Sequence, residues 1–273
     1  MDKNEKLASW QLPQPLWEAL QQLIPEKKSH LGRPRSVNFR TILAGIFYVL
    51  RTGIQWQALS REQFGPPSTV YYYFALWADS GIFEKMWGLA LETYDQLKGL
   101  DWEWQSIDGA MTKAPLGGEA TGKNPTDRSK LGTKRSLMTE AQGIPVAVVS
   151  AGAHVVDKQL LESTLEAVVI EKPSPTEEIT QHVCLDMGYD DVECYRVVLN
   201  QNLTPHIRSQ WELKVEKKKD PTYQSRRWVV EVTHSWLNRF RKILVRFEKL
   251  VSRHLSLLQL ACCYIVFKRA KSF

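Results

Sequence analysis

The sequence predicts an α/β protein in which a mixed β-sheet with flanking helices follows an all-α N-terminal region. Residues 1–100 space their apolar residues with the 3.6-residue period of a helix and show no strand-like alternation. Residues 101–273 instead interleave short alternating or apolar runs with helical segments, an order typical of helices packed on a sheet. The length of 273 residues, of which 43% are hydrophobic, allows two domains with substantial cores. We therefore expect one domain over residues 1–100 and a second over residues 101–273.

The N-terminal region contains two helical segments joined by a turn. The first helix stops near Gly53 and carries an apolar face made of Phe39, Leu43, Ile46, Phe47 and Leu50. After prolines 66 and 67, Ser68 is a good N-cap for a helix over residues 69–79, which includes Tyr72. A helix-turn-helix of this kind is able to place its last helix in a DNA major groove. An ordinary helical bundle has the same pattern, so both interpretations stay open.

The region after residue 100 alternates strands and helices, and acidic residues lie at the ends of its elements. Asp108 ends the first predicted strand before Gly109, and residues 117–135, rich in Gly and basic residues, are predicted as a loop. The elements that follow are a hairpin over 137–140 and 144–150, a helix over 157–169, a strand over 179–186, a helix over 190–199, a strand over 203–208 and a helix over 223–240. Asp186 therefore ends a second strand, and Glu231 lies on the last of these helices.

Three carboxylates, those of Asp108, Asp186 and Glu231, are the candidate catalytic residues. Strand ends and a helix packed on the same sheet are able to bring such side chains to one point. Carboxylate oxygens are the ligands that Mg²⁺ prefers, and two such ions activate the attacking oxygen and stabilise the leaving oxygen of a phosphoryl transfer. The alternative is that each residue has an ordinary role, because Asp before Gly is common in turns and a helical Glu is usually solvated. The sequence predicts a site for two Mg²⁺ ions.

Basic residues concentrate in the last quarter of the chain. Residues 201–273 contain 16 Lys or Arg and only 5 Asp or Glu, whereas the whole chain has a net charge of +6. Such an asymmetry is typical of a surface that binds nucleic acid. Arg227 lies one helical turn before Glu231, and Arg239, Arg241 and Lys242 follow it, so we expect all four to contact phosphate. His234 is interpreted as a neutral structural histidine, with polarisation of a phosphate as the alternative.

Membrane and secreted proteins are excluded by the same sequence. The longest nearly apolar run, residues 255–267, is far shorter than the roughly 20 residues that cross a bilayer. No apolar segment with a cleavage site opens the chain, and the four cysteines have no metal-binding spacing. We expect reduced cysteines packed in the core and a cytoplasmic protein that associates with the nucleoid.

The sequence resembles the bacterial insertion-sequence transposases of the insertion-sequence-five group, which are DDE recombinases. The matching segments cover nearly the whole chain in the expected order: GRPR, ILAGIFYVLRTGIQWQALS, FGPPSTVYYYFALWADSGIFE, SIDGAMTKAP, GKNPTDRSKLGTKR, GIPVAVVSAGAHVVD, LDMGYD and RRWVVEVTHSWLNRFRKILVRFEKL. The chain departs from the family pattern at Met187, Val232 and Asn238, where many relatives have basic residues.

The resemblance implies a ribonuclease-H-like core in which Asp108, Asp186 and Glu231 are the catalytic carboxylates. Arg227 falls on the Arg of the family's C-terminal signature, and the GKNPTDRSKLGTKR segment adds Lys130, Lys134 and Arg135 as expected DNA contacts. The implied reaction is Mg²⁺-dependent cleavage at the element ends, with Mn²⁺ as a substitute, followed by attack of the freed 3′ hydroxyl on target DNA. The implied partners are terminal inverted repeats, target DNA and, because two ends are joined, a second copy or more of the chain.

Two other functions remain open at this point. One is a DNA-binding regulator, derived from a transposase, whose core no longer cuts DNA. The other is a general metal-dependent nuclease without specificity for element ends. Cleavage assays on a terminal repeat and on unrelated DNA separate these possibilities.

Overall fold

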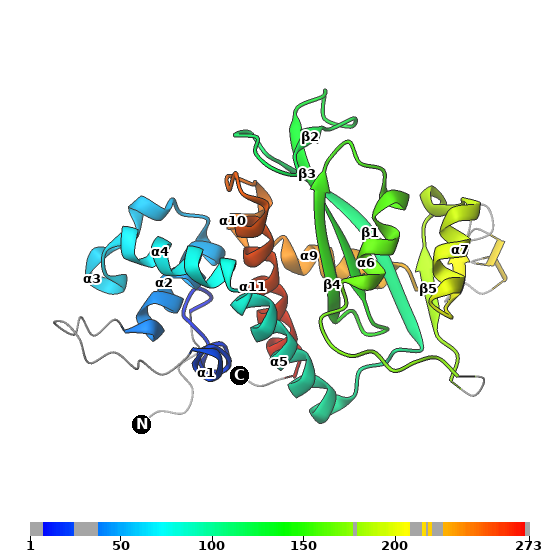
Figure 1. The fold of residues 1–273 in the computed structure, drawn as a ribbon, viewed down its shortest axis with the longest axis horizontal. Coiled ribbons are helices and arrows are strands. Elements are labelled where there is room, and N and C mark those ends of the chain that lie inside the picture. Colours follow the sequence, from blue (N-terminus) through cyan, green and yellow to red (C-terminus); the bar gives the residue numbers. More distant parts are fainter. Residues whose placement is uncertain are drawn as a thin grey trace.

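The computed structural model describes residues 8–24, 38–176, 179–207, 215–216, 218–219 and 226–270. The beginning of the predicted helix over residues 223–240 lies outside the described residues, as does residue 208 at the end of the predicted strand over 203–208. In Figure 1 a group of helices stands on one side and a sheet covered by helices on the other, with α5 (Ile82–Lys98) and α11 (Val251–Ala270) between them.

Among the first hundred residues, those that the structure describes are mainly helical, as the sequence predicts. Asn38 caps the first predicted helix by accepting a hydrogen bond from the Thr41 amide, and Gly53 ends it with a left-handed backbone at φ 72°. The second predicted helix begins two residues earlier than expected, because Pro67 occupies its first turn and Ser68 is not its cap. The elements are α1 (Gln14–Leu23), α2 (Phe39–Thr52), η1 (Trp56–Ala58), α3 (Arg61–Phe64), α4 (Pro67–Asp79) and α5 (Ile82–Lys98).

A six-stranded mixed sheet follows, and β1 lies at its centre. β1 is antiparallel to β3 on one side and parallel to β5 on the other, and β6 continues the sheet parallel to β5. β3 also pairs with β4 and, near its beginning, with the short strand β2. The strands are β1 (Trp104–Lys113), β2 (Gly122–Lys123), β3 (Leu131–Thr139), β4 (Pro145–Gly152), β5 (His182–Leu185) and β6 (Thr204–Ile207). This order confirms the expected ribonuclease-H-like mixed sheet.

Two strands are longer than predicted. β1 continues past Gly109 to Lys113, because β3 pairs with it along this whole length, so Asp108 lies inside the strand and not at its end. β3 begins at Leu131, so Lys134 and Arg135 belong to a strand and not to a loop. Both side chains are buried, and partners distant in the sequence make that burial tolerable.

Helices cover both faces of the sheet. Thr164 on α6 donates a hydrogen bond to Ser136, whereas the neighbouring Arg135 bonds to His234 on α9, so these two helices pack on opposite faces of β3. Helix α9 is shorter than the predicted helix and ends at Leu237, since Phe240 has an extended backbone. The remaining elements are η2 (Asp157–Leu160), α6 (Leu161–Glu166), η3 (Met187–Tyr189), α7 (Val192–Asn200), α9 (Trp228–Leu237), α10 (Arg241–Leu244) and α11 (Val251–Ala270).

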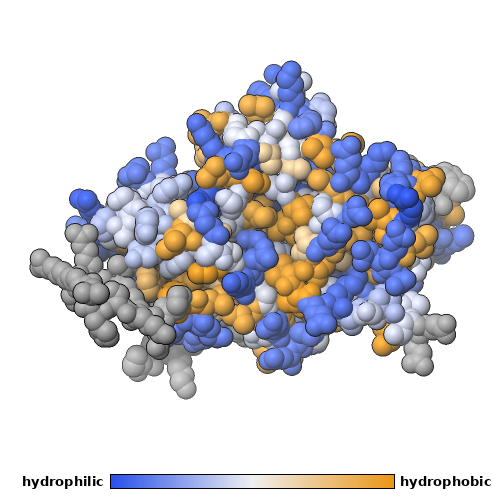
Figure 2. Space-filling model, viewed as in Figure 1, coloured by the Kyte–Doolittle hydropathy of each residue, from blue (hydrophilic) through white to orange (hydrophobic). Residues whose placement is uncertain are grey.

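Helix α11 connects the two parts of the molecule. It packs along α5 and also contacts β4 and α9, and its residues are buried on nearly every side. Figure 2 shows hydrophobic residues gathered toward the middle of one face and hydrophilic residues around them. All four cysteines are buried and none of them forms a disulfide bond, as expected. Among the helices in the described ranges, none is long and apolar enough to cross a membrane. The division of the chain at residue 100 stays a prediction.

Candidate active site

Asp108 and Asp186 extend from neighbouring parallel strands. Ser106 of β1 is paired with Cys184 of β5, so the same register carried two residues further sets Asp108 beside Asp186. β5 ends at Leu185, and Asp186 turns its carboxylate to accept a hydrogen bond from the Gly188 amide at 2.8 Å. Past the end of β5, β1 remains paired with β3 on one side only, so its other edge has no strand beside it near Asp108.

Helix α9 brings the third carboxylate to this edge. The Ser106 hydroxyl donates to the carbonyl oxygen of Arg226 at 3.2 Å, which fixes the beginning of the helix over β1. Thr233, two residues beyond Glu231, donates to the carbonyl of Gly143 in the β3–β4 turn at 2.7 Å and anchors the middle of the helix. Glu231 lies in the first helical turn and remains half exposed.

The Arg227 guanidinium joins two of the three carboxylates. Its Nη2 lies 2.9 Å from Glu231 Oε1, and its Nη1 lies 3.7 Å from Asp186 Oδ2. Glu231 follows Arg227 by one helical turn, and the side chains of such a pair lie on the same face of the helix. Within the described ranges, no three His, Cys, Asp or Glu side chains are already arranged to hold a metal ion. In this state the Arg227 cation therefore compensates the charge of two acids.

The Asp108 carboxyl is electrostatically strained. Burial raises its pKa to about 6, and the negative charges of Asp186 and Glu231 act in the same direction. Arg227 and the Gly109 amide oppose this shift but do not cancel it. Asp108 therefore interacts with both other acids, and an added positive charge would stabilise its ionised form.

His234 connects Asp108 to a buried arginine. Its Nδ1 accepts a hydrogen bond from Arg135 Nε at 3.1 Å, so its Nε2 carries the proton and faces the Asp108 carbonyl oxygen at 3.3 Å. Burial, and then the charge of Arg135, lower the pKa of His234 to about 3. Arg135 also donates to the side chain of Asn238 at 2.8 Å. The neutral structural role predicted for His234 fits these contacts.

Two residues near Asp108, the partly exposed Asp157 and the buried Tyr189, were not identified from the sequence. Asp157 forms an ion pair with Lys134 at 2.9 Å, and its other oxygen has no hydrogen-bond partner among the described residues. The fully buried Tyr189 hydroxyl is also unpaired there, and its pKa is raised by burial and by the charges of Asp157 and Asp108. A Cβ atom at Gly109 would collide with the Asp157 carboxylate. A glycine directly after the strand aspartate was the one local signal of this close packing.

The predicted DNA-contacting residues divide into exposed and buried groups. The exposed residues are Arg239, Arg241, Lys130 and Tyr72, and the Tyr72 side chain on α4 is 60% exposed. The buried residues are Lys134, Arg135 and Lys242, and each of them has a partner within the protein. Their predicted DNA contacts remain untested, and their partners give them structural roles.

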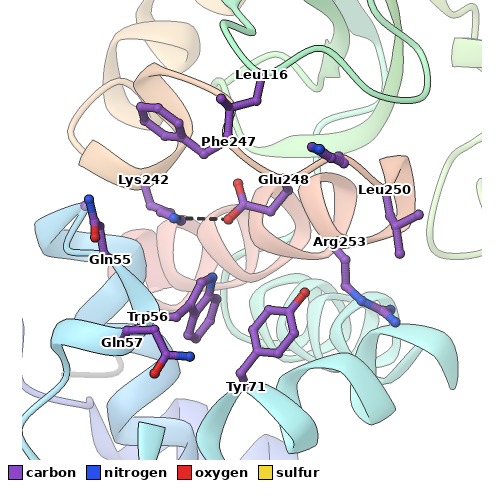
Figure 3. A pocket seen from close by; sticks show the side chains of 12 residues that line it. Gln55, Trp56, Gln57, Tyr71, Leu116, Lys242, Phe247, Glu248, Leu250 and Arg253 are labelled. Carbon is purple, nitrogen blue, oxygen red and sulfur yellow. Dashed lines mark ion pairs between the residues drawn. The ribbon is translucent and has the colours of Figure 1, made fainter. Parts of the chain in front are cut away.

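Lys242 lies in the wall of a cavity of about 690 Å³ between the N-terminal helices and the segment that leads into α11. Figure 3 shows its ammonium group directed at Glu248, and the two groups are 3.1 Å apart. Trp56, Tyr71 and Phe247 give the cavity an aromatic lining. None of the three candidate catalytic acids lines this cavity, so it is separate from the candidate active site.

Comparison with known families agrees with this geometry. Residues 12–87 match the family described as "Putative transposase of IS4/5 family", and residues 95–266 match the family described as "Transposase DDE domain". The second match contains Asp108, Asp186 and Glu231 and covers more than half of the chain.

Two proteins of Burkholderia cepacia are similar in sequence. The chain is 34% identical over 152 residues to the "Putative transposase for insertion sequence element IS402", a match that covers 53% of this chain and 67% of that protein. It is 25% identical over 114 residues to the "Insertion element IS402 uncharacterized 16.2 kDa protein", which covers 40% of this chain and 78% of the relative.

Similarity to solved structures is weak. The Mos1 mariner paired-end complex with Mn has a TM-score of 0.30 and 10% sequence identity, with 88% of this chain and 82% of that chain covered. A pre-cleavage Mos1 transpososome has a TM-score of 0.28 and 8% identity, with 91% and 83% covered. These scores are too low to carry a structural argument. The family matches do not depend on them, and they show that the chain belongs to the DDE-domain transposases.

Proposed function

We propose that this transposase binds the terminal inverted repeats of an insertion sequence, cleaves the DNA there with divalent metal ions and joins the freed 3′ hydroxyl to target DNA. Membership of the family supports DNA cleavage and joining. The observation that carries the assignment of the site is the electrostatic grouping of Asp108, Asp186 and Glu231 around Arg227. Asp108, Asp186 and Glu231 are the proposed catalytic residues.

The residues of the site suit a pair of Mg²⁺ ions. Three carboxylates offer hard oxygen ligands, and the pKa of Asp108, raised mainly by burial and also by the two neighbouring acids, marks a carboxylate that a bound cation would stabilise. Mn²⁺ has similar ligand preferences and is the proposed substitute. When bound, such ions activate the attacking oxygen and stabilise the leaving oxygen of a phosphodiester.

Residues around the acids have positioning roles in this proposal. Asp186 and Glu231, which pair with Arg227 here, would hold a cation, and the Arg227 guanidinium would then be available to contact a phosphate oxygen of the DNA. His234 holds β1 through the carbonyl oxygen of Asp108, because Arg135 fixes its ring orientation from the other side. Exposed Arg239, Arg241 and Lys130 contact the DNA backbone, and these contacts supply affinity without reading sequence.

Recognition of the terminal repeat is assigned to the N-terminal helices. Helix α4 presents Tyr72 to solvent, and this exposed face is available to enter a major groove. Transposition joins two element ends, so we propose a homodimer or a larger assembly on DNA. A ratio of specific to random binding that does not change in Tyr72→Ala would instead favour a packing or assembly role for these helices.

The test of the proposed chemistry is a cleavage assay on a labelled terminal repeat. Asp108→Asn, Asp186→Asn and Glu231→Gln should each abolish cleavage and strand transfer, because each variant removes a ligand charge. Binding to the same duplex should remain within about threefold of wild type, since affinity comes mainly from phosphate contacts. Removing Mg²⁺ with a chelator should stop the wild-type reaction, and Mn²⁺ should restore it.

Asp190→Asn is a matched control, because Asp190 is an exposed aspartate close to Asp186 that forms no ion pair among the described residues. It should cleave as wild type does. A Glu231→Gln protein that still cuts would assign the third ligand position to another residue. A wild-type protein that binds the repeat but never cuts it would be a DNA-binding regulator, and one that degrades unrelated DNA equally well would be a general nuclease.

A further inference from the structure

A second cavity, of about 290 Å³, lies where α2, α9 and α11 end close together. Its lining contains four cationic side chains and no Asp or Glu. Arg51 comes from the last turn of α2, Arg239 follows the end of α9, and Lys268 and Arg269 belong to the last turn of α11. Three segments that are distant in the sequence thus place positive charge around one cavity.

These four cations have no acidic partner among the described residues. None of them forms an ion pair, although other arginines in the protein, such as Arg227 and Arg253, pair with carboxylates. Arg51 is partly buried, and the exposed side chains of Arg239, Lys268 and Arg269 surround it at the rim of the cavity. A group of like charges around a cavity therefore creates a positive potential that an anion can neutralise.

The position of Arg51 shows that this cavity is built and is not a solvated surface of mobile lysines. The Arg51 guanidinium is half-buried, with its central carbon 4.7 Å from the ring centre of Phe240 and 5.4 Å from that of Tyr264. Its Nε donates to the carbonyl oxygen of Ser9 at 2.8 Å. Burial lowers the pKa of Arg51, and the positive charge of Arg239 lowers it further, so the guanidinium is held beside another cation.

We infer that this cavity binds one phosphate group of the DNA backbone, at a place separate from the scissile phosphate. Arginine matches the oxygens of a phosphate group with paired hydrogen bonds, and Lys268 adds a point charge. A volume of about 290 Å³ is enough for a phosphodiester group, since a water molecule takes about 30 Å³. The inference rests on the proposed function, because it takes DNA as the substrate.

The position of the cavity relative to the active site makes the inference specific. Glu231 lies in the first turn of α9, whose last residue, Leu237, is about 9 Å further along a helix that rises 1.5 Å per residue, and Arg239 follows two residues later. Phosphates of one strand advance by about 3.4 Å along the duplex axis. The bound phosphate should therefore lie a few nucleotides from the cleavage site, and the rigid helix fixes that spacing.

A scan with methylphosphonates tests this directly, because each such substitution removes the charge of one chosen phosphate. Terminal-repeat duplexes carrying one substitution at a time are bound to the full-length Asp108→Asn protein, which binds without cutting. A methylphosphonate at one position, a few nucleotides from the cleavage site, should reduce affinity by roughly tenfold. In the same background, Lys268→Gln and Arg239→Gln should each weaken binding to the unmodified duplex by a similar factor. Each should also lower the slope of log affinity against log salt concentration by about 0.9. The affinity of these two variants should also no longer change when the phosphate at that position is replaced by a methylphosphonate.

Lys85→Gln is the matched control, because Lys85 is an exposed lysine on α5 that does not line the cavity. It should leave affinity, salt slope and the position-dependent pattern unchanged. The inference is wrong if Lys268→Gln and Arg239→Gln keep the wild-type pattern, or if Lys85→Gln causes an equal loss. It is also wrong if the cavity binds inorganic phosphate, measured by calorimetry, while no single DNA position is affected, because the ligand is then a free anion.

Failure of the inference and failure of the proposed function give different results. A wild-type protein that cuts the repeat while the cavity variants bind normally keeps the transposase assignment and removes the phosphate site. In the opposite case, the wild-type protein never cuts, but one methylphosphonate lowers its affinity and this loss is absent in Lys268→Gln. That result keeps the phosphate site and removes the catalytic assignment.

Discussion

Individual buried residues show how this protein tolerates polar groups in its core. Arg135 is almost completely buried, and burial lowers its pKa to about 10, yet His234 and Asn238 accept its hydrogen bonds. Glu140 is buried at the end of β3, and burial raises its pKa to about 7, while the amides of Asp101, Gln142 and Ile144 bond to it. His254 on α11 differs from both, because its Nδ1 has no hydrogen-bond partner among the described residues.

His254 should make the protein sensitive to mild acid. Burial, followed by the charges of Arg246 and Arg135, lowers its pKa from the ordinary 6.5 to about 3. The unfolded chain therefore binds a proton below pH 6.5 that the folded chain refuses until about pH 3, so stability falls as the pH falls through this window. Between pH 7.5 and pH 5 this residue alone should lower the free energy of unfolding by about 2 kcal/mol.

The measurement is urea denaturation at several pH values for the wild type and His254→Met. The variant should lose about 2 kcal/mol less than the wild type over this range, because methionine fills a similar volume without titrating. His154→Met is the control, since His154 is exposed on the loop after β4. Equal acid sensitivity of wild type and His254→Met would assign the effect to other groups.

Individual residues also show which parts of the site could be predicted from the sequence. The alternation of Trp104, Ser106 and Asp108 and the apolar run before Asp186 identify the two aspartates from local sequence. The role of His234 depends on Arg135, which is 99 residues away, and the burial of Lys134 depends on Asp157. Local patterns contain no information about such partners, so a basic stretch that looked like a loop is a buried strand.

At the scale of elements, α11 is the helix whose sequence was least informative. Its residues 255–267 are so largely apolar that no face is distinguished, so the sequence predicted that Cys262 and Cys263 pack in the core but not which elements surround them. The structure places it between α5 and the sheet, where Cys263, for example, directs its thiol at the carbonyl oxygen of Met86. A helix surrounded in this way contributes to two packing layers at once.

Leu260→Ala should therefore destabilise the protein strongly. Leu260 is completely buried in α11, and removing a buried leucine side chain typically costs about 2–5 kcal/mol through lost burial and the cavity that remains. Chemical denaturation should give a loss near the middle of that range. Leu199→Ala is the matched control, because the Leu199 side chain on α7 is 58% exposed, and it should change stability by less than about 0.5 kcal/mol. Equal losses in the two variants would mean that α11 is not the shared core.

At the scale of the whole molecule, the first and last helices of the described chain meet. Helix α11 packs on α5 and α1, and bidentate contacts between Arg253 and Asp79 add a link to α4. The N-terminal helices thus share one continuous core with elements that follow the sheet in the sequence. Neither part can bury its apolar residues fully without α11, so the two predicted domains should be coupled energetically whatever their exact boundary.

Hydrogen exchange measures this coupling. If α11 serves both parts, Leu260→Ala should accelerate the slowest amides of α5 and of the central strands β1 and β3 by the same factor, because all of them open together. A loss of about 3 kcal/mol corresponds to roughly a hundredfold faster exchange in each element. Acceleration confined to α5 and α11, with β1 and β3 unchanged, would show that the sheet opens independently of the helices. Uniform acceleration would show that the N-terminal helices and the sheet unfold as one cooperative unit, so that the proposed DNA contacts on both belong to a single folded unit.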